Sequence, residues 1–144
     1  MKKVENYARA FTQLESALPL FLSDPSDELR RDGVIQRFEF TFELAWKSLR
    51  EYMDDQGVSL PVSTPKSVLK AAYAAGILHD EQGWLAMLEA RNLTSHVYDE
   101  QTAVEILEQI NDSFLPLFRS LADFYTREQK HLPTRQTIEK GASP

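Results

Sequence analysis

The fold class is indicated most clearly by residues 27–56, DELRRDGVIQRFEFTFELAWKSLREYMDDQ. Their apolar side chains recur at the three- and four-residue intervals of an α-helix. The alternation within residues 38–42 resembles a strand, but residues 43–47 continue the helical period. Because the helix is apolar on two sides, it needs two sets of neighbours, either in the centre of a bundle or in a subunit interface. The two stripes consist of Val34, Phe38, Ala45, Leu49 and Tyr52, and of Ile35, Phe42, Trp46 and Met53.

The rest of the chain repeats the helical period between clear turn signals. Polar residues that cap helix starts precede four of the apolar segments, and Gly57 and Gly76 supply helix stops. Pro116 lies inside the last segment, where its missing N–H should produce a kink. The predicted helices span residues 3–22, 27–56 and 65–75, a fourth that follows the cap Asp80, and a long fifth that follows the cap Asp99.

Composition sets the class of protein. The chain has 144 residues, 42% of them hydrophobic and 26% charged, and no cysteine, which excludes disulfide scaffolds, thiolate zinc sites and cysteine nucleophiles. No apolar stretch approaches the length of a membrane span, so we expect a cytoplasmic protein without membrane contact. The pattern predicts an all-α, mostly antiparallel bundle of about five helices in residues 1–130, followed by a flexible tail in residues 131–144.

The charge balance bears on nucleic-acid binding. A formal net charge of -6 argues against a general nucleic-acid coat, which would need many Lys and Arg contacts to phosphates. A local basic site remains open, and the most concentrated cations are Arg30, Arg31 and Arg37. Because acidic residues are interspersed among them, this segment is also typical of an ordinary solvated helix face.

Residues 91–98, RNLTSHVY, carry the most informative polar cluster. On helical spacing, Arg91, Ser95 and Tyr98 continue the line of Trp84, so we expect these polar groups on an inward face. Arg91 and His96 lie about 140° apart around an ideal helix. If they act on one substrate atom, the helix end must tighten or a second subunit must contribute.

This set of side chains could cleave RNA by internal attack without a cofactor or a metal ion. His96 would move a proton to or from the ribose 2′-hydroxyl or the leaving oxygen, and Arg91 would stabilise the charged phosphate. Asn92 could orient the imidazole or bind a phosphate oxygen, while Ser95 and Tyr98 add hydroxyls. From spacing alone the more common interpretation is structural, since Arg, Asn and His near a helix end often cap carbonyls or bind a neighbouring acid.

Several motifs together resemble those of one family. They are RFEFTFELAWK at residues 37–47, TPK at 64–66, WLAM at 84–87 and RNLTSHVY at 91–98. In this order the chain resembles the HepT-like branch of the HEPN superfamily, whose members have also been described as nucleotidyltransferase substrate-binding proteins. The resemblance covers residues 3–127.

The resemblance implies a helical bundle that dimerises, so that the Arg-x4-His motifs of two chains meet in one cleft. It implies a metal-independent ribonuclease toxin in which Arg91 and His96 match the catalytic pair, Asn92 the polar residue after the arginine and Tyr98 the motif tyrosine. It also implies an antitoxin partner, a minimal nucleotidyltransferase that transfers AMP from ATP to that tyrosine and silences the nuclease. A second interpretation is a non-catalytic subunit that presents a substrate to the nucleotidyltransferase, and a third is a purely structural helical dimer.

Overall fold

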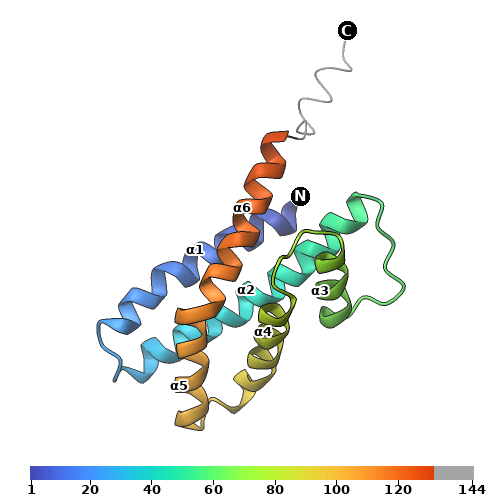
Figure 1. Cartoon of the computed structure of the whole chain (residues 1–144). Helices are drawn as coiled ribbons and strands as arrows, with labels where there is room; N and C mark the ends of the chain where they lie inside the picture. Colours follow the sequence, from blue (N-terminus) through green and yellow to red (C-terminus); the bar gives the residue numbers. More distant parts are fainter. Residues whose placement is uncertain (132–144) are drawn as a thin grey trace.

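The computed structural model describes residues 1–131, and all of its regular elements are helical, as the sequence predicts. Helices α5 and α6 join through one π-helical turn into a single continuous run, so that five long helical segments form the bundle (Figure 1). The elements are α1 (Lys2–Leu22), α2 (Glu28–Asp55), α3 (Pro65–Ala74), α4 (Glu81–Leu93), a 3-10 turn (Thr94–His96), α5 (Glu100–Gln109), the π turn (Ile110–Phe114) and α6 (Leu115–His131).

The helix ends follow the predicted turn chemistry. Gly57 and Gly76 adopt φ values of 81° and 79°, a left-handed conformation that costs glycine little, and they follow the ends of α2 and α3. At four helix starts, a side-chain oxygen accepts a hydrogen bond from a backbone N–H group in the first turn. These caps are Asp27 for α2, Thr64 for α3, Asp80 for α4 and Asp99 for α5.

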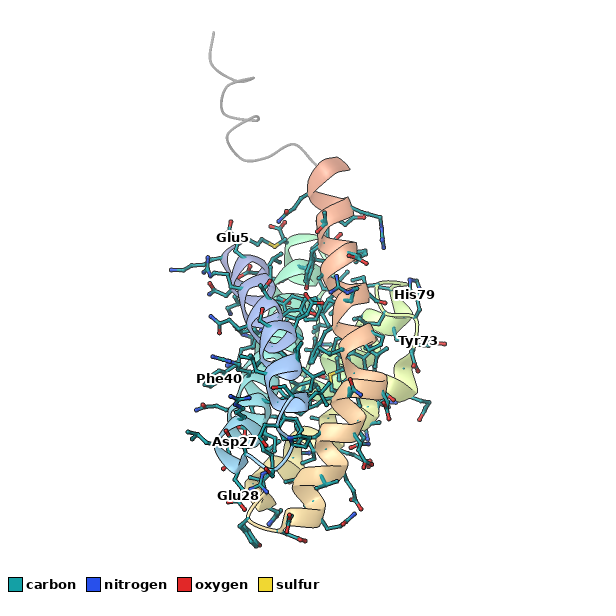
Figure 2. All side chains as sticks on the ribbon, turned by 90° about the vertical axis from the view of Figure 1, so that its left-hand side faces the viewer. Glu5, Asp27, Glu28, Phe40, Tyr73 and His79 are labelled. Carbon is teal, nitrogen blue, oxygen red and sulfur yellow. The ribbon has the colours of Figure 1, made fainter. Side chains whose placement is uncertain are left out.

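Helix α2 occupies the centre of the bundle. It packs against α1 along most of its length and also contacts α3, α4 and α5 (Figure 1). Every side chain of both apolar stripes is buried within the single chain, which settles the alternative that the sequence left open. Phe40 belongs to neither stripe: the residue is 52% exposed and lies on the outside of the bundle (Figure 2).

Helix α6 closes the bundle over α1 and α2 through aromatic packing and buried hydroxyl groups. The Phe118 ring packs against Tyr7, Phe38 and Trp84, with centroid separations of 5.8–6.3 Å. The Tyr7 hydroxyl donates a hydrogen bond of 2.6 Å to the Phe118 carbonyl oxygen. Burial raises the pKa of Tyr7 well above its ordinary value, so this phenol is neutral in the folded protein.

The irregularity expected at Pro116 takes the form of a π turn. Residues 110–114 are π-helical, and the turn ends just before the proline. Because proline cannot donate a backbone hydrogen bond, a wider turn accommodates the missing N–H without ending the helix. Helix α6 continues to His131, and the predicted flexible tail lies outside the described residues from residue 132 onward. None of the described helices is long and apolar enough to cross a membrane.

Candidate functional site

The polar motif lies where α4 ends and the chain turns toward α5. The buried face of α4 runs through Trp84, Met87 and Ala90 and continues to Thr94 in the 3-10 turn. This line lies one residue away from the predicted line through Arg91, so the prediction of an inward polar face was wrong. Arg91 is partly exposed, and the other predicted site residues face solvent: Asn92, Ser95, His96 and Tyr98.

Arg91 is held by groups from two helices. Its Nε atom lies 3.3 Å from Glu43 Oε1, and its Nη1 atom lies 3.9 Å from Glu39 Oε2, both carboxylates being on α2. Nη1 also donates a hydrogen bond of 3.1 Å to Thr94 Oγ1. Thr94 in turn donates to the Arg91 carbonyl oxygen at 2.7 Å, so this buried hydroxyl links the side chain to the backbone at the end of α4.

The arginine nevertheless keeps an edge that the protein does not use. Its side chain is 29% exposed. Among the side chains that the structure describes, Nη2 makes no hydrogen bond, and the buried Nε lacks an aligned hydrogen bond even though Glu43 is close. The guanidinium is thus anchored through Nε and Nη1, and it presents the N–H groups of Nη2 as potential donors to a ligand.

His96 and Tyr98 form a second pair beside the arginine. The His96 Nδ1 atom and the Tyr98 hydroxyl lie 3.2 Å apart, and the two rings meet edge to face with a centroid separation of 5.9 Å. Among the described residues, the other ring nitrogen, Nε2, has no hydrogen-bond partner. The imidazole therefore keeps one nitrogen for proton exchange with a bound molecule, and the Tyr98 side chain is 84% exposed.

Within one chain, the side chains of Arg91 and His96 make no polar contact with each other. The 3-10 turn tightens the helix end, which is one of the two ways in which the spacing allowed Arg91 and His96 to converge, but the polar contacts of Arg91 go to α2 and Thr94. Asn92 and Ser95 are connected only locally, by a hydrogen bond of 3.4 Å from Ser95 Oγ to the Asn92 carbonyl oxygen. The structure therefore places all the predicted site residues in one surface region, but the side chains of a single chain do not converge on one substrate position.

The sequence reasoning missed the α2 residues that hold the arginine. Glu39 and Glu43 are four residues apart and thus share one face of α2, a signal that could have marked a cation-binding pair. Trp46 donates its indole N–H to Glu43 Oε2 at 3.1 Å. The contact with neighbouring acids agrees with the structural interpretation of Arg91, whereas the free Nη2 edge is what a phosphate-binding role requires.

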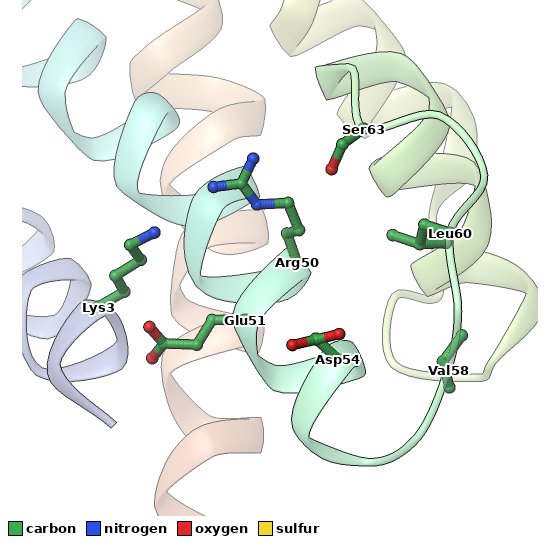
Figure 3. A pocket seen from close by; sticks show the side chains of 7 residues that line it. All are labelled: Lys3, Arg50, Glu51, Asp54, Val58, Leu60 and Ser63. Carbon is green, nitrogen blue, oxygen red and sulfur yellow. The ribbon is translucent and has the colours of Figure 1, made fainter.

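Two hollows of the surface lie away from this region. A hollow of about 400 Å³ lies between the first turn of α1, the end of α2 and the loop that follows (Figure 3), and no motif residue lines it. A groove of about 260 Å³ between α1 and α2 includes Arg30 and Arg37 of the predicted basic cluster but not Arg31. Arg30 is paired with Asp27, and Arg31 is paired with Asp32. In the part of the chain that the structure describes, no three His, Asp or Glu side chains gather where they could hold a metal ion.

Comparisons with known proteins place the chain among relatives with the same fold. A curated relative from Haemophilus influenzae, "Probable ribonuclease HepT", is 32% identical over 83 residues, which are 56% of this chain and 57% of that protein. The chain thus spans little more than half of that relative's length. A crystal structure of a protein from Thermus thermophilus is 35% identical, with a TM-score of 0.71 over 80% of this chain and 94% of that one.

A second solved structure carries a functional description. The HI0074 protein of Haemophilus influenzae, reported as the fold of a substrate binding domain of a nucleotidyltransferase, is 27% identical, with a TM-score of 0.74 over 83% of this chain and 96% of that one. The family model "Nucleotidyltransferase substrate binding protein like" matches residues 2–127, which include the RNLTSHVY motif and the α2 residues that hold its arginine. The chain therefore belongs to the nucleotidyltransferase substrate binding protein like family, whose HepT-like relatives the sequence motifs resemble.

Proposed function

We propose that the protein is a metal-independent endoribonuclease toxin of the HepT type, and that Arg91 and His96 are its catalytic residues. The observation that carries this proposal is the pairing of an anchored arginine, whose Nη2 donors are free, with an exposed imidazole whose Nε2 is free, in one turn at the end of α4. The relative named as a probable ribonuclease supports the same reaction class.

The proposed reaction needs only groups of this kind. The ribose 2′-oxygen attacks the adjacent phosphorus, and the bond between phosphorus and the 5′-oxygen of the next nucleotide breaks. A neutral His96 takes the proton of the 2′-hydroxyl, and a protonated imidazole or water gives a proton to the departing 5′-oxygen. Arg91 stabilises the charge that develops on the phosphate oxygens through its Nη2 donors. The products are a 2′,3′-cyclic phosphate and a 5′-hydroxyl.

A homodimer would complete the site. Within one chain, His96 lies on an exposed surface and has no polar contact with Arg91, so a single motif offers neither an enclosed cleft nor a second imidazole. Two exposed apolar side chains close to the motif in sequence or space support an interface: Leu93 lies inside the motif, and Phe40 follows Glu39 on α2. A second copy would add a second His96, so that one imidazole could act as the base of the reaction and the other as the acid.

Tyr98 is the proposed site of silencing by a minimal nucleotidyltransferase antitoxin. Its exposure leaves the hydroxyl accessible to another protein, and its hydrogen bond to His96 Nδ1 places any modification beside the catalytic imidazole. In AMP transfer the Tyr98 oxygen attacks the α-phosphorus of ATP, pyrophosphate leaves, and the phenol proton passes to a base or to solvent. The added phosphate would repel RNA and replace the hydroxyl that lies 3.2 Å from His96 Nδ1.

The alternative is a non-catalytic subunit that binds a substrate for a nucleotidyltransferase. The description of HI0074 as a substrate binding domain favours this alternative, as does the pairing of Arg91 with two carboxylates. The two functions differ in one respect that is easy to measure, because a binding subunit associates with the nucleotidyltransferase but leaves RNA intact.

The deciding experiment incubates purified protein with mixed cellular RNA in EDTA, next to Arg91→Ala and His96→Ala. Intact mass first establishes that Tyr98 is unmodified. We expect cleavage by the wild type alone, leaving 2′,3′-cyclic phosphate ends. If the unmodified wild type leaves RNA intact, the ribonuclease proposal fails and the substrate-binding alternative takes its place.

A further inference from the structure

We infer that Glu43 on α2 is a positioning residue, which orients the guanidinium of Arg91 so that Nη2 faces the RNA phosphate. This inference rests on the proposed ribonuclease function and adds a second helix to the site. It also gives the RFEFTFELAWK segment a role beyond the core, because Glu43 lies within it and points toward α4 rather than inward.

The two oxygen atoms of Glu43 are engaged in different directions. Oε2 accepts the hydrogen bond from the Trp46 indole N–H at 3.1 Å, and Oε1 lies 3.3 Å from Arg91 Nε. Trp46 is buried and cannot turn freely, so its N–H fixes the plane of the carboxylate. The carboxylate can thus accept the indole hydrogen bond through one oxygen while its other oxygen forms the ion pair with Arg91.

The position of the carboxylate determines which edge of the arginine remains free. The guanidinium is a rigid planar fork, so fixing Nε and Nη1 also fixes the direction of Nη2. Glu43 lies beside Nε, on the edge that Nε–H shares with one Nη2 hydrogen, and Thr94 accepts from Nη1, so the outer Nη2 hydrogen is the donor left for a ligand. Without Glu43, the side chain can rotate about its long stem, and the Nη2 donors lose their fixed direction. Small displacements of a catalytic group reduce the rate of the chemical step strongly.

The same carboxylate opposes RNA binding, and this opposition makes the inference testable. Negative charge next to a phosphate-binding arginine weakens the attraction for RNA. If Glu43 were merely a surface acid, its neutralisation would improve activity. If it orients Arg91, its neutralisation lowers KM for RNA but also lowers kcat, because the orientation is lost while the repulsion is relieved.

The substitution Glu43→Gln tests the orienting contact because it keeps the shape of the side chain and removes its charge. A glutamine side chain has the shape of glutamate but offers one acceptor oxygen and one NH2 donor. Both neighbours of Glu43 are donors, the Trp46 indole and the Arg91 guanidinium. In Glu43→Gln, one of them must therefore face the NH2 group. The indole competes with the arginine for the single oxygen.

Two further variants isolate the orienting role. Glu39→Gln is the matched control, because Glu39 carries the same charge on the same face of α2 but lies farther from the guanidinium, 3.9 Å from Nη1, whereas Glu43 lies 3.3 Å from Nε. Trp46→Phe, combined with Glu43→Gln, removes the competing indole donor and lets the glutamine oxygen return to Arg91. Thermal unfolding of every variant shows whether the bundle is intact.

The experiment measures kcat and KM for one RNA substrate in EDTA, with the wild type and these variants. We expect Glu43→Gln to lower kcat about tenfold or more while KM falls. Glu39→Gln should also lower KM, but it should lower kcat much less than Glu43→Gln does, and the double variant should recover part of kcat. An equal kcat for Glu43→Gln and Glu39→Gln, or no recovery in a folded double variant, would overturn the positioning role.

A measurement independent of activity separates this inference from the proposed function. The 15N and 1H signals of the Arg91 Nε–H group report its surroundings directly by NMR. We expect them to shift and broaden in Glu43→Gln and to stay in place in Glu39→Gln. Absence of RNA cleavage by the wild type overturns the proposed function, whereas unchanged Arg91 signals in Glu43→Gln overturn the orienting contact itself.

Discussion

Replacing Thr94 by valine should loosen Arg91 while leaving the bundle folded. The Thr94 side chain is buried at 5% exposure, and its hydroxyl accepts from Arg91 Nη1 and donates to the Arg91 carbonyl oxygen. Valine has nearly the same shape but offers neither interaction. The backbone carbonyl keeps a partner, because the Thr94 backbone N–H also donates to it. The loss is therefore concentrated on the guanidinium.

The expected cost follows from the exposure of the arginine. A hydrogen bond to a charged group contributes about 1.5–3 kcal/mol. Arg91 is 29% exposed, so water replaces part of the lost bond, and the added valine methyl gains up to about 0.8 kcal/mol of apolar burial. We expect a net loss of about 1–2 kcal/mol, which corresponds to a decrease of roughly 3–8 °C in Tm for a domain of this size.

Thermal unfolding and RNA cleavage together test this reasoning. Thr94→Ser is the matched control, since it keeps the hydroxyl and loses only a methyl group. We expect Thr94→Val to lose both stability and kcat, and Thr94→Ser to retain kcat. A Thr94→Val protein that is as stable and as active as the wild type would refute the view that this hydroxyl anchors Arg91.

Three further predictions concern stability and the site. Burial raises the pKa values of Tyr7 and Tyr125 above the value of about 10 in the unfolded chain, so stability is full below pH 10 and falls above it, by about 1.4 kcal/mol for each of these two groups at pH 11. Urea unfolding at pH 8 and pH 11 measures the loss, and Tyr7→Phe should remove about 1.4 kcal/mol of it. His96→Ala should change the unfolding free energy by less than about 0.5 kcal/mol, because the side chain is exposed; a cooperative loss of fold on heating near room temperature would instead reveal a structural role. Tyr98→Phe should lower cleavage by roughly fivefold at most, the value of one exposed hydrogen bond, and should prevent AMP transfer by the nucleotidyltransferase; transfer to the Phe variant, seen by intact mass, would disprove the role of Tyr98.

The sequence predicted the helices well because local chemistry determines their ends. Asp27 and Thr64 accept backbone hydrogen bonds where the capping pattern placed them, and Gly57 adopts the conformation that a helix stop requires. The two stripes of α2 required two sets of neighbours, and both sets are present within the chain. These features depend on residues close together in sequence, which is why they could be predicted.

The site was predicted less completely because it depends on packing between helices. Leu85, Met87 and Leu88 offer apolar side chains on adjacent lines of α4, and the contact with the rest of the bundle decides which line is buried. The structure buries the line through Met87, and the motif therefore faces outward. The contact between Glu43 and Arg91 joins residues far apart in sequence, so only the three-dimensional arrangement reveals it.

The central claim is that this protein cleaves RNA by attack of a ribose 2′-hydroxyl, using Arg91 and His96. The most direct measurement compares two versions of one short RNA, identical except for a single 2′-deoxy substitution at the nucleotide before the mapped cleavage position, in EDTA with protein whose Tyr98 is unmodified. We expect that the all-ribose RNA is cut to a 2′,3′-cyclic phosphate and that the substituted RNA stays intact at that position. Cleavage of both RNAs at the same position, or of neither, would contradict this claim.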